Sequence, residues 1–148
     1  MNAFLAHINI GVLKAPIDDP MIADFADNLD KINAIAESSP GFVWRLKDAD
    51  NNATSFNPYN NELIIVNISV WTTLKNLKDY AYQTDHMTFF KRRHEWFNPL
   101  DKPHMCLWWT EPQNMTDANE GKKRLDHLWE NGPTQFAFDF RTYDQYSN

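Results

Sequence analysis

Two ionisable side chains, His86 and Arg93, lie within an aromatic stretch that the sequence predicts to be helical. At about 100° per residue, both fall on one side of that helix together with Phe90 and Phe97. A helix with such an apolar side packs against the rest of the protein, where an unpaired charge costs several kcal/mol. We therefore expect a partner for both side chains. A planar guanidinium beside a group that titrates near neutrality suits an anionic or enolisable ligand.

Both side chains also have purely structural interpretations. His86 fits the description of a core histidine whose hydrogen bonds are satisfied inside the fold. Arg93 fits an ion pair with Asp85 or Glu95, or a cap on the carbonyl groups at the C-terminus of a helix. Their shared aromatic face favours a functional role, and both interpretations stay open at this point.

Two asparagines in the middle of predicted strands form a second group of candidates. Asn9 and Asn67 each occupy an odd-numbered position, next to His7 and Trp71 in the alternation of their strands. Asparagine is disfavoured inside strands, so both positions need a reason. One reason is a hydrogen bond to buried backbone or a wet interface, and the other is a ligand.

Histidine and cysteine spacing gives little support for a metal site. His86 and His94 are eight residues apart on the predicted helix, which is roughly 12 Å along its axis and too far to share an ion. A scattered trio of His7, His86 and His104 predicts little. Cys106 is the only cysteine, so no intrachain disulfide forms, and we interpret it as a core residue. We predict no bound metal.

Length and composition describe one domain that covers residues 1–148. The net charge of −6 argues against nucleic acid as a partner, because phosphate binding needs concentrated Lys and Arg. No apolar run approaches the ~20 residues of a membrane span, and the N-terminus lacks the basic start of a signal peptide. We therefore expect a soluble, cytoplasmic protein.

The hydrophobic pattern predicts alternating strands and helices, and we interpret the order as β-α-β-β-α-β with an added helix and edge strand. The predicted elements are a strand over 4–12, a helix over about 21–36, strands over 42–46 and 62–71, a helical region over 72–97, a strand over 104–111, a helix capped by Thr116 and stopped at 131–133, and a short strand over 136–140.

That order is typical of the α+β class with a ferredoxin-like antiparallel sheet and helices on one face. The strand over 62–71 is apolar on both sides and therefore needs cover on its second face as well. A second copy of the chain, packed face to face, is the economical cover, so we expect a homodimer.

The loop over 47–61 is long and rich in Asn, Asp and Pro. It carries Phe56 and Tyr59, which gives it apolar surface to bury. We predict that this loop is mobile and borders the site as a lid, with a mobile hairpin tip of no function as the alternative.

Several segments together resemble a known family. They are APIDDPMIADFADNLDKINAIAESSPGFVWRL, LIIVNISVW, the spacing HxxxxxxRxxWF that starts at His86, LWWTEP, and GPTQFAFDF. They resemble a bacterial domain-of-unknown-function family of the dimeric α/β-barrel superfamily, near the antibiotic-biosynthesis monooxygenases. The resemblance covers nearly the whole chain, from about residue 5 to 140.

The resemblance implies a location for the site more than a chemistry. The superfamily includes cofactor-independent monooxygenases, haem-degrading enzymes, and small isomerases or lyases, all with a cleft between helices and sheet. Its haem degraders use an Asn on the first strand, a Trp at the end of a central strand and a His on the next helix. Asn9, Trp71 and His86 occupy similar places here.

Three functions follow from these residues. The first is an enzyme of the monooxygenase type that needs no cofactor and acts on a small aromatic or enolisable substrate, with His86 as base and Asn9 holding an oxyanion. The second is a non-catalytic binding module for such a ligand or for haem, and the third is a dimeric scaffold. The predicted catalytic residues are His86, Asn9 and Arg93, and the predicted ligand-binding residues are Trp71, Asn67, His7, Phe90 and Trp96.

Overall fold

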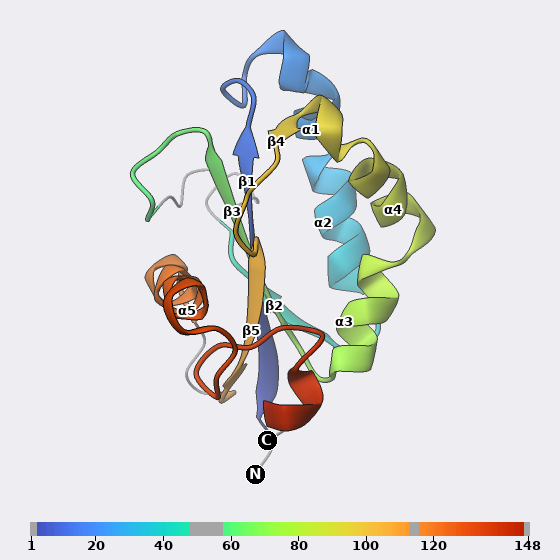
Figure 1. Cartoon of the computed structure of the whole chain (residues 1–148). Helices are drawn as coiled ribbons and strands as arrows, with labels where there is room; N and C mark the ends of the chain where they lie inside the picture. The colour runs from blue at the N-terminus through green and yellow to red at the C-terminus, as the bar shows by residue number, and fades with distance from the viewer. Residues whose placement is uncertain (1–2, 48–57, 113–115, 147–148) are drawn as a thin grey trace.

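The computed structural model describes residues 3–47, 58–112 and 116–146, and Figure 1 shows its elements in order. The strands are β1 (Phe4–Leu13), β2 (Phe42–Arg45), β3 (Ile64–Trp71), β4 (Phe97–Asn98) and β5 (Met105–Thr110). The α-helices are α1 (Ala23–Asp27), α2 (Leu29–Ser38), α3 (Leu74–Ala81), α4 (Thr84–Lys91) and α5 (Ala118–Asn131), and the 3-10 helices are η1 (Pro20–Ile22), η2 (Arg93–Glu95) and η3 (Tyr143–Tyr146).

One antiparallel sheet contains all of these strands, in the order β2-β3-β1, with β4 and β5 both paired to β1. This order and the helices that connect the strands confirm the α+β, ferredoxin-like class. β1 is the central strand, and its predicted alternation is confirmed. Ala6, Ile8 and Ile10 are buried on one side, while His7 and Asn9 point to the other. We call these sides the even face and the odd face.

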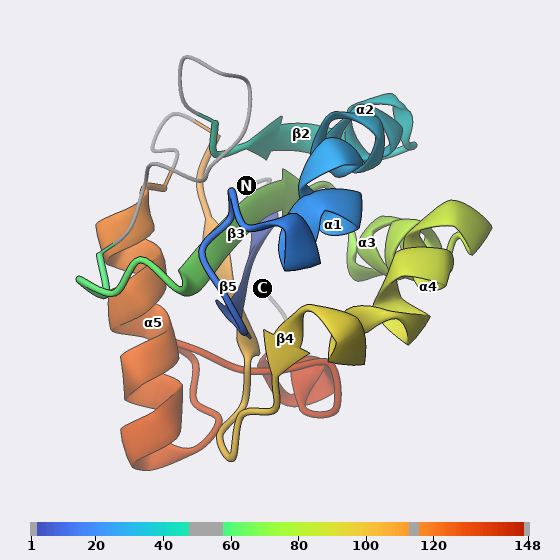
Figure 2. The same ribbon diagram turned by 90° about the horizontal axis from the view of Figure 1, so that it is seen from above.

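The odd face is covered by the layer of α1 to α4, and α5 lies on the even face (Figures 1 and 2). Leu125 and Leu128 of α5 pack in one core cluster with Ile8 and Ile68 of the sheet. Gly121 makes that approach close, because a Cβ at this position would lie 2.7 Å from the Ile68 Cδ1 atom. The expectation of helices on one face alone is therefore incomplete.

This position of α5 changes the reasoning about a dimer. Val66, Ile68 and Val70 of β3 are at most 1% exposed within the single chain. The apolar face that seemed to need a second copy is already covered by α5. Association of two copies stays a prediction, without its original reason.

The expectation of one helical region over residues 72–97 was wrong in its extent. The chain there forms α3, α4, η2 and β4 as separate elements. Gln83 starts α4 by accepting a hydrogen bond from the His86 N–H at 2.9 Å. α4 ends at Lys91, and only the short η2 follows it, because Phe97 must be extended to pair with Leu13 of β1. Phe97 therefore does not share a helix face with His86.

Two smaller predictions also need correction, and a third is confirmed. Asp117, and not Thr116, caps α5, by accepting a hydrogen bond from the Glu120 N–H at 2.8 Å. α5 ends as predicted at Gly132, whose φ of 73° suits glycine. The strand expected over 136–140 is reduced to a single bridge between Phe138 and Leu107.

Most of the loop predicted to act as a lid, including Phe56, lies outside the described residues. Tyr59, at its described end, packs against the core cluster of the even face, and the Lys122 ammonium of α5 lies 5.2 Å from its ring. Tyr59 is therefore on the opposite side of the sheet from His86, which contradicts its expected role in a lid. None of the helices in the described segments is both long and apolar enough to cross a membrane.

Candidate functional site

A row of polar side chains crosses the middle of the odd face. Asn9 of β1 is the direct register partner of Asn67 of β3, and His7 is the partner of Ser69. Directly opposite residues on one face of an antiparallel pair have side chains in contact range. We call His7, Asn9, Asn67 and Ser69 the polar band.

Two separate apolar clusters flank the polar band. One cluster contains Leu5, Ala36, Trp71, Leu77, Leu107 and Phe138, and the other contains Leu13, Ile22 and Trp96 with Phe25, Phe89 and Phe97 packed against them. A continuous core would have put apolar side chains between them. The sequence instead places hydrogen-bonding groups there, on the most central strands of the sheet.

The helical layer does not seal the polar band. Asn67 is exposed, and His7 and Asn9 are half-buried, although β1 and β3 are the two inner strands of the sheet. On the even face, by contrast, their neighbours Ile8 and Ile68 are fully buried. Apart from Ser69, which is buried, the band is therefore accessible polar surface on the inner side of the fold.

His7 is held in its neutral form. Burial lowers its pKa from 6.5 to about 3, and the charges of His104 and His86 would lower it further in the same direction. The Phe140 ring stacks on the imidazole, with centroids 6.2 Å apart and planes within 12°. An imidazole in this setting offers one donor and one acceptor at neutral pH.

His86 has the geometry of a general base. Its Nδ1 atom lies 2.8 Å from the Ala81 carbonyl oxygen, which accepts only, so Nδ1 carries the proton and donates it. Nε2 of the neutral ring is then an acceptor, and no described residue bonds to it. Burial lowers the pKa of His86, with the Ala81 hydrogen bond acting weakly in the opposite sense.

Aromatic contacts connect His86 to the polar band. The His86 ring lies 5.0 Å from the Tyr80 ring, and Tyr80 stacks on Trp71 at 5.2 Å. The Trp71 indole N–H then donates to the Ser69 hydroxyl at 2.8 Å. His86 is therefore fixed at one end of a continuous chain of contacts that reaches the sheet.

Asn9 is held by His104. The Nδ1 atom of His104 lies 3.0 Å from the Asn9 Oδ1 atom. Burial lowers the pKa of His104, so the ring is neutral near pH 7 and donates through Nδ1 to the amide oxygen. The Asn9 amide N–H groups then remain as donors on the polar band. The expected oxyanion-binding role of Asn9 is compatible with this arrangement.

Arg93 and Phe90 are not buried, which corrects the expectation of a charge in the interior. Arg93 is exposed, and Phe90 is 41% exposed. The guanidinium donates to the Phe90 carbonyl at 2.9 Å and lies 4.1 Å from the Phe90 ring centroid. The two side chains form one unit at the surface. Glu95, one of the two partners considered for Arg93, pairs with Arg92 instead, and the side chain of Asp85, the other, lies outside what the structure describes.

Trp71 and Trp96 are core residues and were wrongly expected on the wall of the site. Trp71 is 0% exposed and Trp96 is 2% exposed. Trp96 packs between Phe25 and Phe89, with centroid distances of 5.6 and 6.0 Å. Neither ring offers surface to a ligand, so both belong to the packed core beneath the site.

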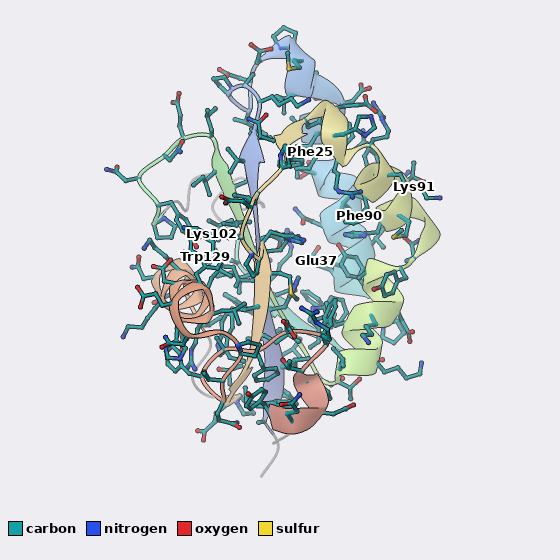
Figure 3. The ribbon with its side chains drawn as sticks, viewed as in Figure 1. Phe25, Glu37, Phe90, Lys91, Lys102 and Trp129 are labelled. Carbon is teal, nitrogen blue, oxygen red and sulfur yellow. The ribbon has the colours of Figure 1, made fainter. Side chains whose placement is uncertain are left out.

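Sequence reasoning missed three residues near the polar band. Phe140 reaches His7 from the C-terminal segment, and Tyr80 bridges His86 to Trp71. Arg45 of β2 is 5% exposed, and its Nε lies 3.2 Å from the Glu37 carboxylate of α2. Figure 3 labels Glu37 on the side of α2 that faces the sheet. For Arg45, the only signal in the sequence was a charged residue within the short predicted strand over 42–46.

Other surfaces offer weaker candidates. Within the described part of the chain, no three His, Cys, Asp or Glu side chains form a group that could hold a metal ion, so the absence of a metal stays a prediction. Two shallow hollows lie on the outer side of α5, where Lys122 pairs with Asp126 and Lys102 lies over Trp129. Their lining is a helix surface with ordinary exposed charges, whereas the polar band lies on the two inner strands, so the band remains the better candidate.

The family of the chain follows from its sequence. Residues 4–148 match a family described as a domain of unknown function, DUF3291. This chain belongs to the DUF3291 family. No curated protein matches it.

Solved structures resemble the DUF3291 chain in fold. SnoaB, a cofactor-independent oxygenase from Streptomyces nogalater, matches with a TM-score of 0.50 and 16% identity, over 78% of this chain and 99% of SnoaB. PA3566 from Pseudomonas aeruginosa matches with a TM-score of 0.52 and 10% identity, over 78% and 98%. A candidate antibiotic biosynthesis monooxygenase from Nitrosomonas europaea matches with a TM-score of 0.50 and 13% identity, over 79% of this chain and 97% of that protein. At such identities the likeness shows the fold alone.

Proposed function

We propose that this DUF3291 protein is a small-molecule enzyme of the monooxygenase type. In this proposal a small aromatic or enolisable substrate binds on the polar band and is oxidised by O₂ without a cofactor. The single observation that carries the proposal is His86, a neutral imidazole with Nδ1 held by a backbone carbonyl and Nε2 left as a base. The likeness to SnoaB agrees with it at the level of the fold.

The proposed reaction needs only His86, Asn9 of the polar band, the substrate and O₂. His86 Nε2 takes a proton from an activated CH₂ carbon, and the Asn9 amide donates to the oxygen on which the negative charge develops. The carbanion gives an electron to O₂, and the two radicals combine to a peroxide anion, which takes the proton back from His86 to form a hydroperoxide. Loss of water leaves a carbonyl, so one oxygen atom enters the product and the other leaves as water.

Anthrone provides a direct test, because its oxidation to anthraquinone consumes one O₂ and releases one water. We expect His86→Ala to lower the enzyme-dependent rate by about 10²-fold or more, the usual contribution of a general base. The fold should remain, since the half-buried His86 ring leaves a smaller cavity than a packed core side chain. O₂ uptake and anthraquinone absorbance measure the rate against spontaneous oxidation.

His94→Ala is the matched control, because His94 is an exposed histidine on the adjacent η2. We expect it to keep the wild-type rate. Equal rates for wild type and His86→Ala, with both proteins folded by circular dichroism, would remove the proposed role of His86. A large fall in melting temperature for His86→Ala would instead identify it as a structural histidine.

A non-catalytic binding module is the second candidate. The free Nε2 atom of His86 is also the type of ligand that holds haem iron, and His86 alone among the described residues has this carbonyl-fixed geometry. Haem bound there would supply redox chemistry, and His86 would be the residue that holds its iron. A Soret shift on haem titration that disappears in His86→Ala, with no anthrone turnover, would favour this candidate.

The homodimer and the cytoplasmic location expected from the sequence belong to the same proposal. Support for the location is the single cysteine, which is buried and makes no disulfide. Sedimentation and cell fractionation test the two expectations separately from catalysis.

A further inference from the structure

Arg93 differs from three other arginines of the described chain in having no carboxylate partner there. Arg92, its neighbour, pairs with both Asp24 and Glu95, at 2.9 and 2.8 Å. The remaining pairs are Arg45 with Glu37 and Arg124 with Glu120. The Arg93 guanidinium instead makes one hydrogen bond to a neutral carbonyl and stacks on the Phe90 ring. Among the side chains that the structure describes, no carboxylate therefore neutralises its positive charge.

The main chain brings Arg93 towards the polar band. η2 runs directly into β4, which pairs with Val12 and Leu13 of β1. Further along the same edge of β1, the His104 carbonyl accepts a hydrogen bond from the Ile10 N–H at 2.8 Å. The positive charge of Arg93 also contributes to the lowered pKa of His104. The segment that carries Arg93 therefore runs along the same edge of β1 as the histidine that holds Asn9.

The other cations of this segment are directed elsewhere. Lys91 points away from the sheet on the outer side of α4, whereas Phe90, the ring under Arg93, lies on the inner side (Figure 3). His7 of the polar band is neutral at pH 7, and so are the nearby histidines His86 and His104. A cation without a described carboxylate partner, beside a neutral hydrogen-bonding surface, is suited to a ligand with an anionic group.

We propose that the substrate of this site carries a carboxylate, which pairs with Arg93 while the enolisable or phenolic part of the molecule lies on the polar band. This inference rests on the proposed function and specifies its substrate class. The exposed Phe90 ring holds the guanidinium in place by stacking, so less side-chain freedom is lost when the carboxylate binds.

A matched pair of probes tests the proposal. A naphthol and the hydroxynaphthoate that adds a carboxylate on the far ring share the phenol and the aromatic area. We expect wild type to bind the hydroxynaphthoate about tenfold more tightly, as one charge-assisted hydrogen-bonded pair would give. Arg93→Gln should remove that preference and leave naphthol affinity unchanged, and Arg93→Lys should restore part of it. Isothermal titration calorimetry measures the affinities of the three proteins for both probes, and added salt should reduce the preference.

Lys91→Gln is the control, because it removes one positive charge from the same segment at a side chain that points outward. It should keep the preference. Equal affinities of the two probes for wild type would overturn the inference, and so would a preference that survives in Arg93→Gln. Loss of naphthol binding in His86→Ala, together with equal probe affinities in wild type, would show that the proposed site stands while its carboxylate selectivity fails.

Discussion

Three histidines, His7 on the odd face and His86 and His104 beside it, are held in the neutral form. Their neutral form makes the stability of the fold depend on pH. The pKa of His7 falls to about 3, and the pKa values of His86 and His104 are also lowered, in each case mainly by burial. The unfolded chain binds protons at these positions near pH 6.5 while the folded chain does not. Their stabilisation is therefore complete above pH 6.5 and is lost as the pH falls below it.

We predict a steep loss of stability between about pH 6.5 and about pH 5, before most carboxylates titrate. His7 alone contributes a slope of up to ~1.4 kcal/mol per pH unit in that range. His7→Asn cannot titrate, so its free energy of unfolding should vary less with pH than that of wild type. Urea unfolding at several pH values measures both slopes, and equal slopes would contradict a neutral His7.

The stacked ring of Phe140 offers an independent check on the same residue. Phe140→Ala opens one side of the His7 imidazole to water, so the pKa of His7 should rise towards its ordinary value. NMR titration of the His7 ring proton reports this directly. A His7 signal that titrates identically in both proteins would show that burial by Phe140 is not the cause.

At the scale of elements, the break between α4 and β4 decides which aromatic residues are core and which are surface. Trp96 is 2% exposed in a cluster with Phe25 and Phe89, whereas Phe90 on α4 is 41% exposed. We predict that Trp96→Ala costs ~3–5 kcal/mol of stability and that Phe90→Ala costs less than ~1 kcal/mol. Urea unfolding separates the two, and similar costs would contradict the break.

The elements that local sequence determines were predicted well. β1 was expected over 4–12 and runs over Phe4–Leu13, because its alternation is unbroken. The end of α5 at Gly132 was predicted from an Asn-Gly-Pro stop signal. In each case the signal lies within the element itself.

The failures share a different cause. The helix was extended to Phe97 because its spacing is helical, but pairing with Leu13, more than eighty residues earlier, requires a strand there. Phe140 was missed because nothing near it in the sequence indicates a contact with His7. The burial of Arg93 was inferred from a helix face that the structure does not form. Long-range pairing decides all three.

At the scale of the whole molecule, α5 and a second copy of the chain are competing covers for the even face. Each would bury Ile8 and Ile68, which are fully buried under α5 within the single chain. The burial of each such side chain contributes about 1.5–3 kcal/mol, so the face must be covered by one or the other. The fit of α5 at Gly121 distinguishes the two arrangements, since it matters only when α5 is in place.

We predict that Gly121→Val lowers the stability of the chain by ~1–3 kcal/mol through overpacking. A side chain at this position would meet the Cδ1 atoms of Ile68 and Ile8, at 2.7 and 2.8 Å from the Cβ. Lys123→Val places the same β-branched residue at an exposed position of α5 and corrects for helix propensity. Thermal melts of the two variants, with sedimentation of each, provide the measurement. If a second copy covered the even face with α5 displaced, Gly121→Val would melt like Lys123→Val and would sediment as a dimer, because residue 121 would then contact neither isoleucine.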